Sequence, residues 1–210
     1  MKVVVGKALL RGTLQWTQRL LAAAAILLLS YCGFVLVDAW VFQQRESRTL
    51  QQLLDNRHNP NAGSLQFRPA QSTPGPPAIA ASGLIGRIEI PRLRLSAIVI
   101  EGDDSRALRR AVGHITGTPL PGQAGNIALT GHRDTFFRPL RNIRRDDTIV
   151  VTTLQGEYRY RVVSTKVVGP NDVAVLDPTI DEILTLVTCF PFYFVGAAPD
   201  RFIVRAERII

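Results

Sequence analysis

One thiol in the C-terminal part of the sequence lies where it could act as a nucleophile. Cys189 falls near the end of the apolar run Leu-Thr-Leu-Val-Thr-Cys-Phe-Pro-Phe at residues 184–192, and the proline two residues later ends the preceding element. A cysteine attacks as its thiolate, whereas a free thiol has a pKa of about 8.5 and is mostly protonated at neutral pH. It therefore needs a base, and His132, in Thr-Gly-His-Arg-Asp at 130–134, is the candidate.

Arg201 is the third candidate, because a guanidinium offers several fixed donors to an oxyanion and never loses its charge. The imidazole would hold the thiol proton during attack on an acyl carbon and return it to a leaving amine. We expect Cys189 to end one strand and Arg201 to begin the next. Parallel pairing of 184–189 with 201–206 would bring both side chains to one end of the sheet.

Each of these residues also has a plainer interpretation. A lone cysteine in an apolar strand is usually a packing residue, a histidine after Thr-Gly can cap a turn, and most arginines are exposed. Asp134 is more often a helix cap than a residue that orients His132. A zinc site from Cys189, His132 and His114 lacks the usual Cys-x-x-Cys or His-x-x-x-His spacing, so His114 is interpreted as a core or rim histidine. The coincidence of all three candidates with strand ends favours a catalytic site.

The region 84–210 is predicted to be all-β. Alternating runs of branched and aromatic residues predict strands at 84–90, 93–101, 126–130, 147–154, 157–168, 183–189 and 201–209. Asp104 or Ser105 can cap a short helix, and Asp134 or Thr135 a helical turn. About seven or eight short strands without βαβ alternation favour a closed or nearly closed barrel of antiparallel type.

Residues 20–42 are predicted to form a transmembrane helix. Leu20 to Val37 is a stretch of eighteen residues without a charge, and a single aspartate separates it from the apolar residues 39–42. A helix that crosses a bilayer core needs roughly 20 apolar residues, whereas the apolar segment of a cleaved signal peptide has about 7 to 15. A removable signal peptide is therefore the weaker alternative. Basic residues without any acid occupy 1–19, which places that segment in the cytoplasm and the rest of the chain outside.

A linker is expected between the anchor and the domain. Residues 43–58 lack Gly and Pro and carry leucines at helical spacing, so the helix should continue into a stalk with His58 solvated at its end. Residues 59–83 contain five prolines and three glycines, which predicts a semi-rigid tether. The predicted divisions are therefore 1–19, 20–42, 43–83 and 84–210.

The net charge of +8 does not indicate nucleic-acid binding. Residues 1–82 hold 8 basic and 3 acidic residues, whereas 83–210 hold 17 and 14. The domain is thus close to balanced, and it lacks the long basic run of a nucleic-acid patch. With only Cys32 and Cys189 present, and Cys32 in the apolar segment, the thiols fit a site and not a disulfide framework.

Taken together, these patterns resemble the sortases, which are membrane-anchored cysteine transpeptidases. The resemblance rests on Thr130-Gly131-His132, on Thr185 to Cys189 (Thr-Leu-Val-Thr-Cys), and on Arg201 twelve residues later. It covers 84–210, the anchor fits it, and the form Thr-Leu-Val-Thr-Cys-Phe-Pro-Phe with a short connection to the arginine is most similar to class D. It implies an eight-stranded sortase-type barrel with His132, Cys189 and Arg201 as catalytic residues.

The resemblance further implies cleavage of an LPxTG-like sorting signal, a thioacyl enzyme at Cys189, and transfer of the acyl group to an amine of a cell-surface precursor or pilin. Thr188 and Thr130 would contact the substrate or oxyanion. No cofactor is expected. Some sortases bind calcium through loop acids, for which the candidates are Glu101, Asp103, Asp104, Asp172 and Asp177, although their spacing forms no recognised calcium loop.

Two alternatives stay open from the residues. A cysteine endopeptidase would pass the same acyl group to water, and product analysis with and without an added amine separates it from a transpeptidase. The other alternative is a noncatalytic β-barrel binding module. Its Cys189→Ala variant would retain full partner binding, and Cys189 in the folded protein would not react with a thiol-alkylating probe.

Overall fold

The computed structural model describes residues 7–58, 79–80, 83–193 and 196–209. The chain divides into two compact units, Met1–Val41 and Phe42–Ile210, and helix α1 (Lys7–His58) runs from the first into the second. In the first unit large apolar side chains are exposed, for example Leu27 (71%) and Phe34 (70%). One stretch of the described chain, Leu14–Asn56, is long and apolar enough to cross a membrane. The predicted tether, 59–83, lies outside the described residues except for 79–80 and 83.

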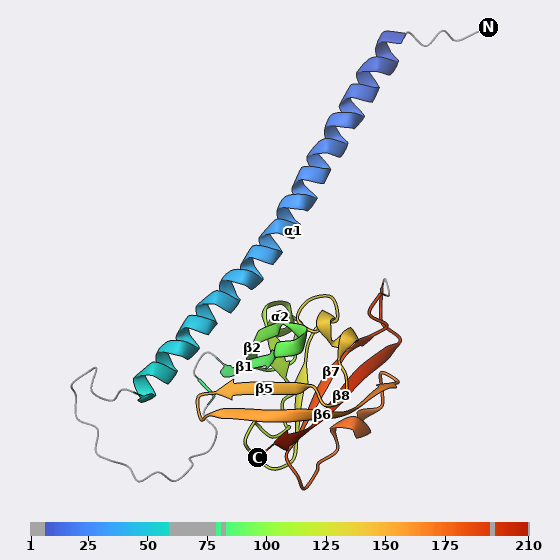
Figure 1. Ribbon diagram of the computed structural model, residues 1–210. Helices are drawn as coiled ribbons and strands as arrows, with labels where there is room; N and C mark the ends of the chain where they lie inside the picture. Colours follow the sequence, from blue (N-terminus) through green and yellow to red (C-terminus); the bar gives the residue numbers. More distant parts are fainter. Residues whose placement is uncertain (1–6, 59–78, 81–82, 194–195, 210) are drawn as a thin grey trace. The chain divides into compact units, whose positions relative to one another are not determined.

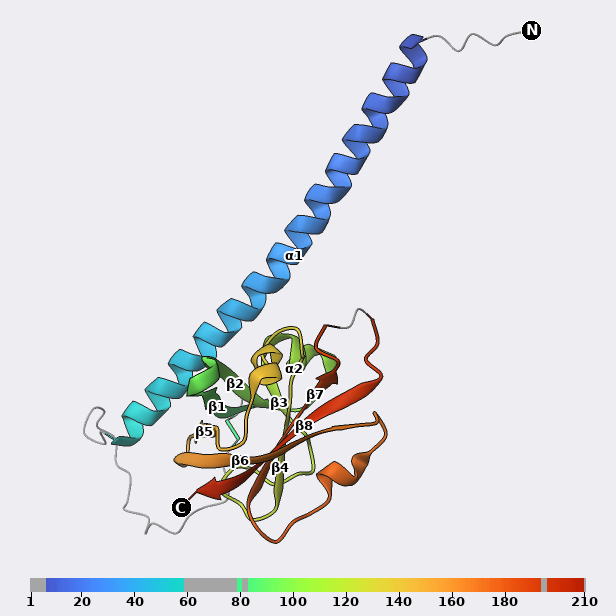
Figure 2. The same ribbon diagram turned by 45° about the vertical axis from the view of Figure 1, so that its right-hand side comes forward.

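The second unit contains a closed barrel of eight strands in the order β1-β2-β3-β4-β7-β8-β6-β5 (Figures 1 and 2). The predicted eight-stranded barrel is confirmed. Its strands are β1 (Leu84–Ile90), β2 (Leu95–Glu101), β3 (Val112–His114), β4 (Asn126–Thr130), β5 (Thr148–Thr153), β6 (Glu157–Val168), β7 (Ile183–Phe190) and β8 (Asp200–Ile209). Its helices are α2 (Ser105–Arg110) and the 3-10 turns η1 (Pro91–Leu93), η2 (Arg138–Asn142) and η3 (Val173–Leu176).

The sequence pattern explains most of these elements. Alternate residues of the strands fill the barrel, and Ile88, Leu129 and Val204 are fully buried in its core. Asp104 caps α2, as one of the two predicted alternatives, by accepting hydrogen bonds from the backbone amides of Ala107 and Arg106. These two bonds hold the pKa of the Asp104 carboxyl below its ordinary value.

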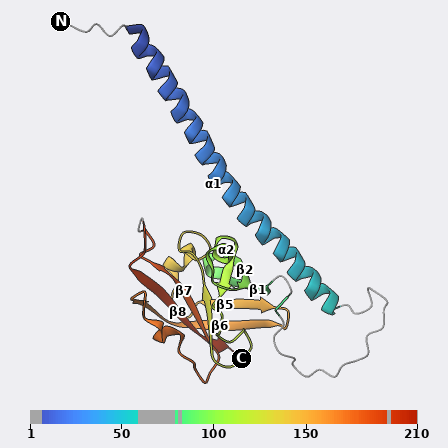
Figure 3. The same ribbon diagram turned by 180° about the vertical axis from the view of Figure 1, so that it is seen from behind.

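Strands β7 and β8 pair antiparallel, so the parallel pairing considered for 184–189 and 201–206 is wrong (Figure 3). The reason is the length of the connection, residues 191–199. A parallel crossover typically takes a dozen or more residues and a helix, whereas an antiparallel hairpin can be joined by few. The parallel pairs of the barrel are instead β2–β3, whose connection 102–111 contains helix α2, and β4–β7, whose connection is much longer.

These pairing directions decide which loops meet. The ends of β1, β4, β6 and β7 and the starts of β2, β3, β5 and β8 all lie at the same end of the barrel. His132, Cys189 and Arg201 come from three of these strand ends. The turns η1 and η2 lie at this end too.

The last turns of α1 pack against the outside of the barrel. Leu50 is only 1% exposed, in a cluster with Leu84, Ile98 and Ala111. The amide of Gln43 adds two hydrogen bonds: its oxygen accepts from the backbone N–H of Ile98 (2.9 Å), and its nitrogen donates to the carbonyl of Arg110 (2.7 Å). The segment predicted as a stalk is therefore part of the barrel unit from Phe42 onward.

Candidate active site

Pairing of β4 with β7 brings the histidine loop to the thiol. Beyond the last paired residues, the N–H of Gly131 donates to the carbonyl of Val187 (3.2 Å), and the hydroxyl of Thr188 donates to the carbonyl of Gly131 (2.7 Å). His132 and Cys189 each follow these residues directly. These two bonds hold the ends of β4 and β7 together, so His132 and Cys189 lie at the ends of neighbouring strands.

The antiparallel register places Arg201 directly opposite Cys189. Residues opposite each other in such a pair have Cβ atoms about 4.5–5.5 Å apart. One guanidinium nitrogen of Arg201, Nη1, donates to the carbonyls of Ala198 (3.3 Å) and Asp200 (3.0 Å). Among the described residues nothing accepts from Nε or Nη2, so these donors remain for a ligand.

The thiol is accessible and does not form a hydrogen bond with the imidazole. Cys189 is free and half-buried, and His132 is half-buried. In the part of the chain that the structure describes, neither side chain makes a hydrogen bond. Catalytic hydrogen bonds are often long or misaligned without substrate, so this arrangement is compatible with acid–base chemistry.

Arg133, next to His132, ties the histidine loop to the loop after Cys189. Its side chain is 7% exposed, Nη1 donates to the carbonyl of Pro191 (3.0 Å), and Nη2 donates to the carbonyl of Gly196 (3.0 Å). Two parallel donors of one rigid fork therefore hold the start and the end of the β7–β8 loop. Sequence reasoning missed this residue, and the only available signal was an arginine beside the candidate base.

Aromatic side chains support the same loop. Phe190, Phe192 and Phe202 form a cluster with ring centroids 5.4–6.3 Å apart, and two of them, Phe192 and Phe202, also pack on the main core. Phe190 and Phe202 directly follow Cys189 and Arg201. The cluster thus fixes the backbone on both sides of the thiol–guanidinium pair.

The other candidate residues have contacts of their own. Thr188 is 2% exposed and its hydroxyl bridges β7 to β4, and Thr130 lies half-buried at the end of β4. Asp134 is 72% exposed and lies 3.6 Å from Arg133, so its visible partner is that guanidinium and not His132. For both threonines, contact with substrate or oxyanion stays a prediction.

His114 is a buried structural residue of β3. It is 2% exposed, with Nδ1 2.7 Å from a carboxylate oxygen of Glu101 and Nε2 3.0 Å from the carbonyl of Pro119 and the hydroxyl of Thr118. These contacts tie the loop after β3 to β2. The interpretation of His114 as a core histidine agrees with this burial.

The acids considered for calcium are not gathered into a site among the described residues, where no group of three or more His, Cys, Asp and Glu could hold a metal ion. Glu101 is paired with His114, and Asp104 caps α2. Asp103, Asp172 and Asp177 are exposed. For these acids, calcium binding stays a prediction, because a calcium site needs six to eight oxygen ligands.

A closed β-barrel with a cysteine, a histidine and an arginine at one end defines a class of cysteine acyl transferases. Residues 88–209 match the family model for the sortase domain. Sortase D of Bacillus subtilis (strain 168) is 31% identical over 193 residues, which cover 89% of this chain and 94% of that protein.

Solved structures agree with this match. The Sortase D5 transpeptidase of Clostridium perfringens is 22% identical and has a TM-score of 0.63 over 80% of this chain and 99% of its own, which shows the shared fold. Sortase A of Listeria monocytogenes is 26% identical, with a TM-score of 0.57 over 61% of this chain and 88% of its own. The chain belongs to the sortase family, and its likeness to class D is confirmed. It is thus a cysteine transpeptidase of the sortase type.

Proposed function

We propose that this chain is a membrane-anchored transpeptidase that cleaves an LPxTG-like sorting signal at Cys189 and transfers the acyl group to an amine of a cell-surface precursor or pilin. The observation that carries the proposal is the placement of Cys189 opposite Arg201, with His132 on the neighbouring strand end. The apolar part of α1 would anchor the chain, with its N-terminus in the cytoplasm and the barrel outside.

Each of the three residues has a separate role in this proposal. The thiolate of Cys189 attacks the carbonyl carbon of the signal's threonine, and the protonated His132 gives its proton to the departing amine as the C–N bond breaks. Arg201 stabilises the oxyanion through its free Nε and Nη2 donors. The acceptor amine then attacks the thioester, its proton passes to His132, and the C–S bond breaks.

The test is mass spectrometry of the full chain in detergent with a library of sorting-signal peptides, with and without an added amine. We expect a peptide adduct on Cys189, a peptide–amine product when the amine is present, and neither after Cys189→Ala. Equal amounts of hydrolysed product with and without amine would instead support the endopeptidase. A product that persists in Cys189→Ala would refute the proposed chemistry.

A second measurement addresses the arginine. Arg201→Lys keeps the positive charge but loses the planar fork, and removal of one oxyanion donor typically costs about 10²–10³-fold in turnover. We expect a kcat/KM loss of about that size with little change in the unfolding midpoint. Activity close to that of the unsubstituted chain would exclude an oxyanion role for Arg201.

A further inference from the structure

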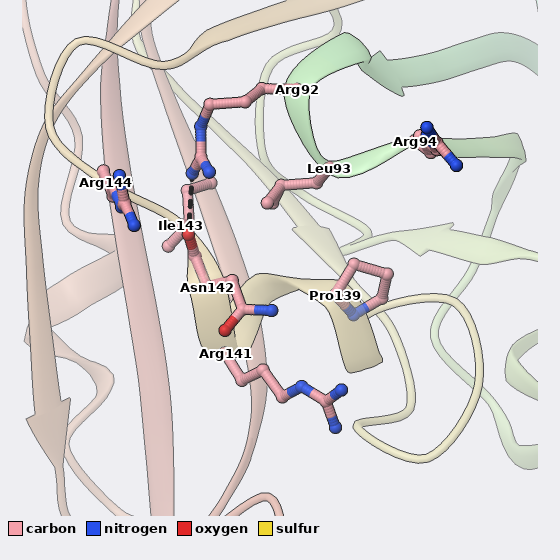
Figure 4. A pocket seen from close by; sticks show the side chains of 8 residues that line it. All are labelled: Arg92, Leu93, Arg94, Pro139, Arg141, Asn142, Ile143 and Arg144. Carbon is pink, nitrogen blue, oxygen red and sulfur yellow. Dashed lines mark hydrogen bonds between the residues drawn. The ribbon is translucent and has the colours of Figure 1, made fainter.

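A cavity of about 570 Å³ lies between η1 and η2, at the same end of the barrel as the thiol. Arg92 and Arg94, in and just after η1, and Arg141 and Arg144, in and just after η2, line it together with Asn142 (Figure 4). The volume falls within the roughly 300–1,000 Å³ of typical small-molecule sites. Its chemistry differs from that of the thiol site because arginines supply most of its polar groups.

Asp147 is the acid that pairs with Arg92, and it also interacts through its charge with Arg144. Arg92 donates from Nε and Nη2 to the carboxylate of Asp147, and Nη2 also donates to the carbonyl of Asn142 (2.6 Å). Asp147 is only 7% exposed on its side chain and accepts a further bond from the backbone N–H of Arg144 (2.8 Å). This network fixes the two walls of the cavity relative to each other.

Four arginines against this one carboxylate leave an excess of positive charge. Among the described residues, Arg94, Arg141 and Arg144 form no ion pair with a carboxylate, and the nearby Asp146 instead pairs with Arg161. Uncompensated positive charges along one cavity repel one another, and a concave wall concentrates their field. An anion would relieve this repulsion.

The cavity is connected to the catalytic loop through Arg141. Its guanidinium carbon lies 5.5 Å from the ring centroid of Tyr193, four residues after Cys189. This cation–π contact joins the wall of the cavity to the loop that follows the thiol. A ligand in the cavity would therefore sit beside that loop, without contacting the thiol in the arrangement described.

We propose that this cavity is a binding site for a phosphate-bearing ligand. Several arginines along one cavity suit the multiple oxygens and the higher charge of a phosphate better than the single charge of a carboxylate. The ligand is either a free phosphate or diphosphate group, or the phosphodiester of a lipid headgroup. The inference does not depend on the thiol chemistry, because binding is measured without turnover.

The experiment is calorimetric titration of the full chain in a nonionic detergent, carrying Cys189→Ala, with inorganic pyrophosphate and separately with glycerophosphoglycerol. Arg94→Gln and Arg144→Gln should each weaken binding of the preferred ligand by about tenfold or more, since each removes a charge-assisted contact. Because neither side chain has an ion-pair partner, both variants should keep the unfolding midpoint of the parent. Tighter binding of pyrophosphate identifies a free phosphate or diphosphate ligand, and tighter binding of glycerophosphoglycerol identifies a lipid headgroup.

Arg109→Gln, on the exposed surface of α2, is the matched control. It removes the same charge from an exposed residue that does not line the cavity, and it should leave the affinity within about twofold. Equal losses in Arg109→Gln and Arg144→Gln would show nonspecific attraction and overturn the proposal. Absence of binding by both ligands would overturn it as well.

Discussion

Arg133 offers the sharpest test of how the catalytic loop is held. It donates one hydrogen bond to Pro191 and one to Gly196, both at 3.0 Å, from a side chain that is 7% exposed. A charge-assisted hydrogen bond contributes about 1.5–3 kcal/mol. Arg133→Lys can remake one bond and should lose about that amount of stability, whereas Arg133→Met loses both and should lose roughly twice as much.

The effect on catalysis should exceed the effect on folding. Without the fork the loop after Cys189 can shift, and a misplacement of about 1 Å can reduce turnover on the order of 10²-fold. We expect Arg133→Met to lower kcat with a smaller change in KM. Arg133→Lys should have a kcat between those of Arg133→Met and the unsubstituted chain. Steady-state kinetics and the pH dependence of Cys189 alkylation measure this, alongside urea unfolding for stability.

Arg138→Met is the matched control, because Arg138 is exposed on η2 in the same segment. It should leave both stability and kcat nearly unchanged. If Arg133→Met lost stability but kept its kcat and its alkylation profile, the bonds to the loop would be structural only. The positioning role would then be refuted.

Three further changes test the assignments made above. His114→Ala should lower the unfolding midpoint but leave the kcat of the folded fraction nearly intact. His132→Ala should lower kcat by about 10²–10⁴-fold without a matching loss of stability. Equal losses of kcat in the two variants would mean that the base is wrongly assigned. The hydrogen bonds from the Arg92 guanidinium lower the pKa of the Asp147 carboxyl below its ordinary value, so the stability that this pair contributes is present above the ordinary pKa of an aspartate and is lost as the pH falls through the lowered pKa. Asp147→Asn should therefore lower the free energy of unfolding in urea by about 1–2 kcal/mol at pH 7. The difference from the unsubstituted chain should disappear at acid pH, and a difference that persists there would contradict the assignment. Leu50→Ala should destabilise the barrel unit by about 2–3 kcal/mol, while Leu53→Ala, at a 39% exposed position, should change it little, and equal effects would argue against packing of this helix on the barrel.

The strands of the barrel were predictable because their signal is local. Residues 157–168 alternate in period two after a Gln-Gly turn, and β6 has those bounds. The prediction failed at Leu93, which belongs to η1 and not to β2, because Pro91 begins a 3-10 turn that a count of branched residues does not register. The short helix predicted with Asp104 or Ser105 as its cap is α2, which ends at Arg110 because Val112 already pairs with Val99 of β2.

The site was only partly predictable. The residue types and their positions at strand ends pointed to Cys189, His132 and Arg201. Their proximity depended on pairing, and the pairing direction considered for the last two strands was wrong. The antiparallel hairpin places Cys189 opposite Arg201, because the end of β7 and the start of β8 meet at the turn that joins them, whereas parallel strands would have kept them at opposite ends.

What the sequence by itself determined were properties set by near neighbours: an apolar segment long enough to span a bilayer, strands of alternating pattern, and a thiol, an imidazole and a guanidinium in recognisable local settings. Tertiary structure alone decided which distant residues meet. Arg133 reaches Gly196, Arg92 reaches Asp147, and Leu50 packs against Leu84. Such contacts depend on strand order and register, which involve chain segments far apart in sequence, so no local pattern encodes them.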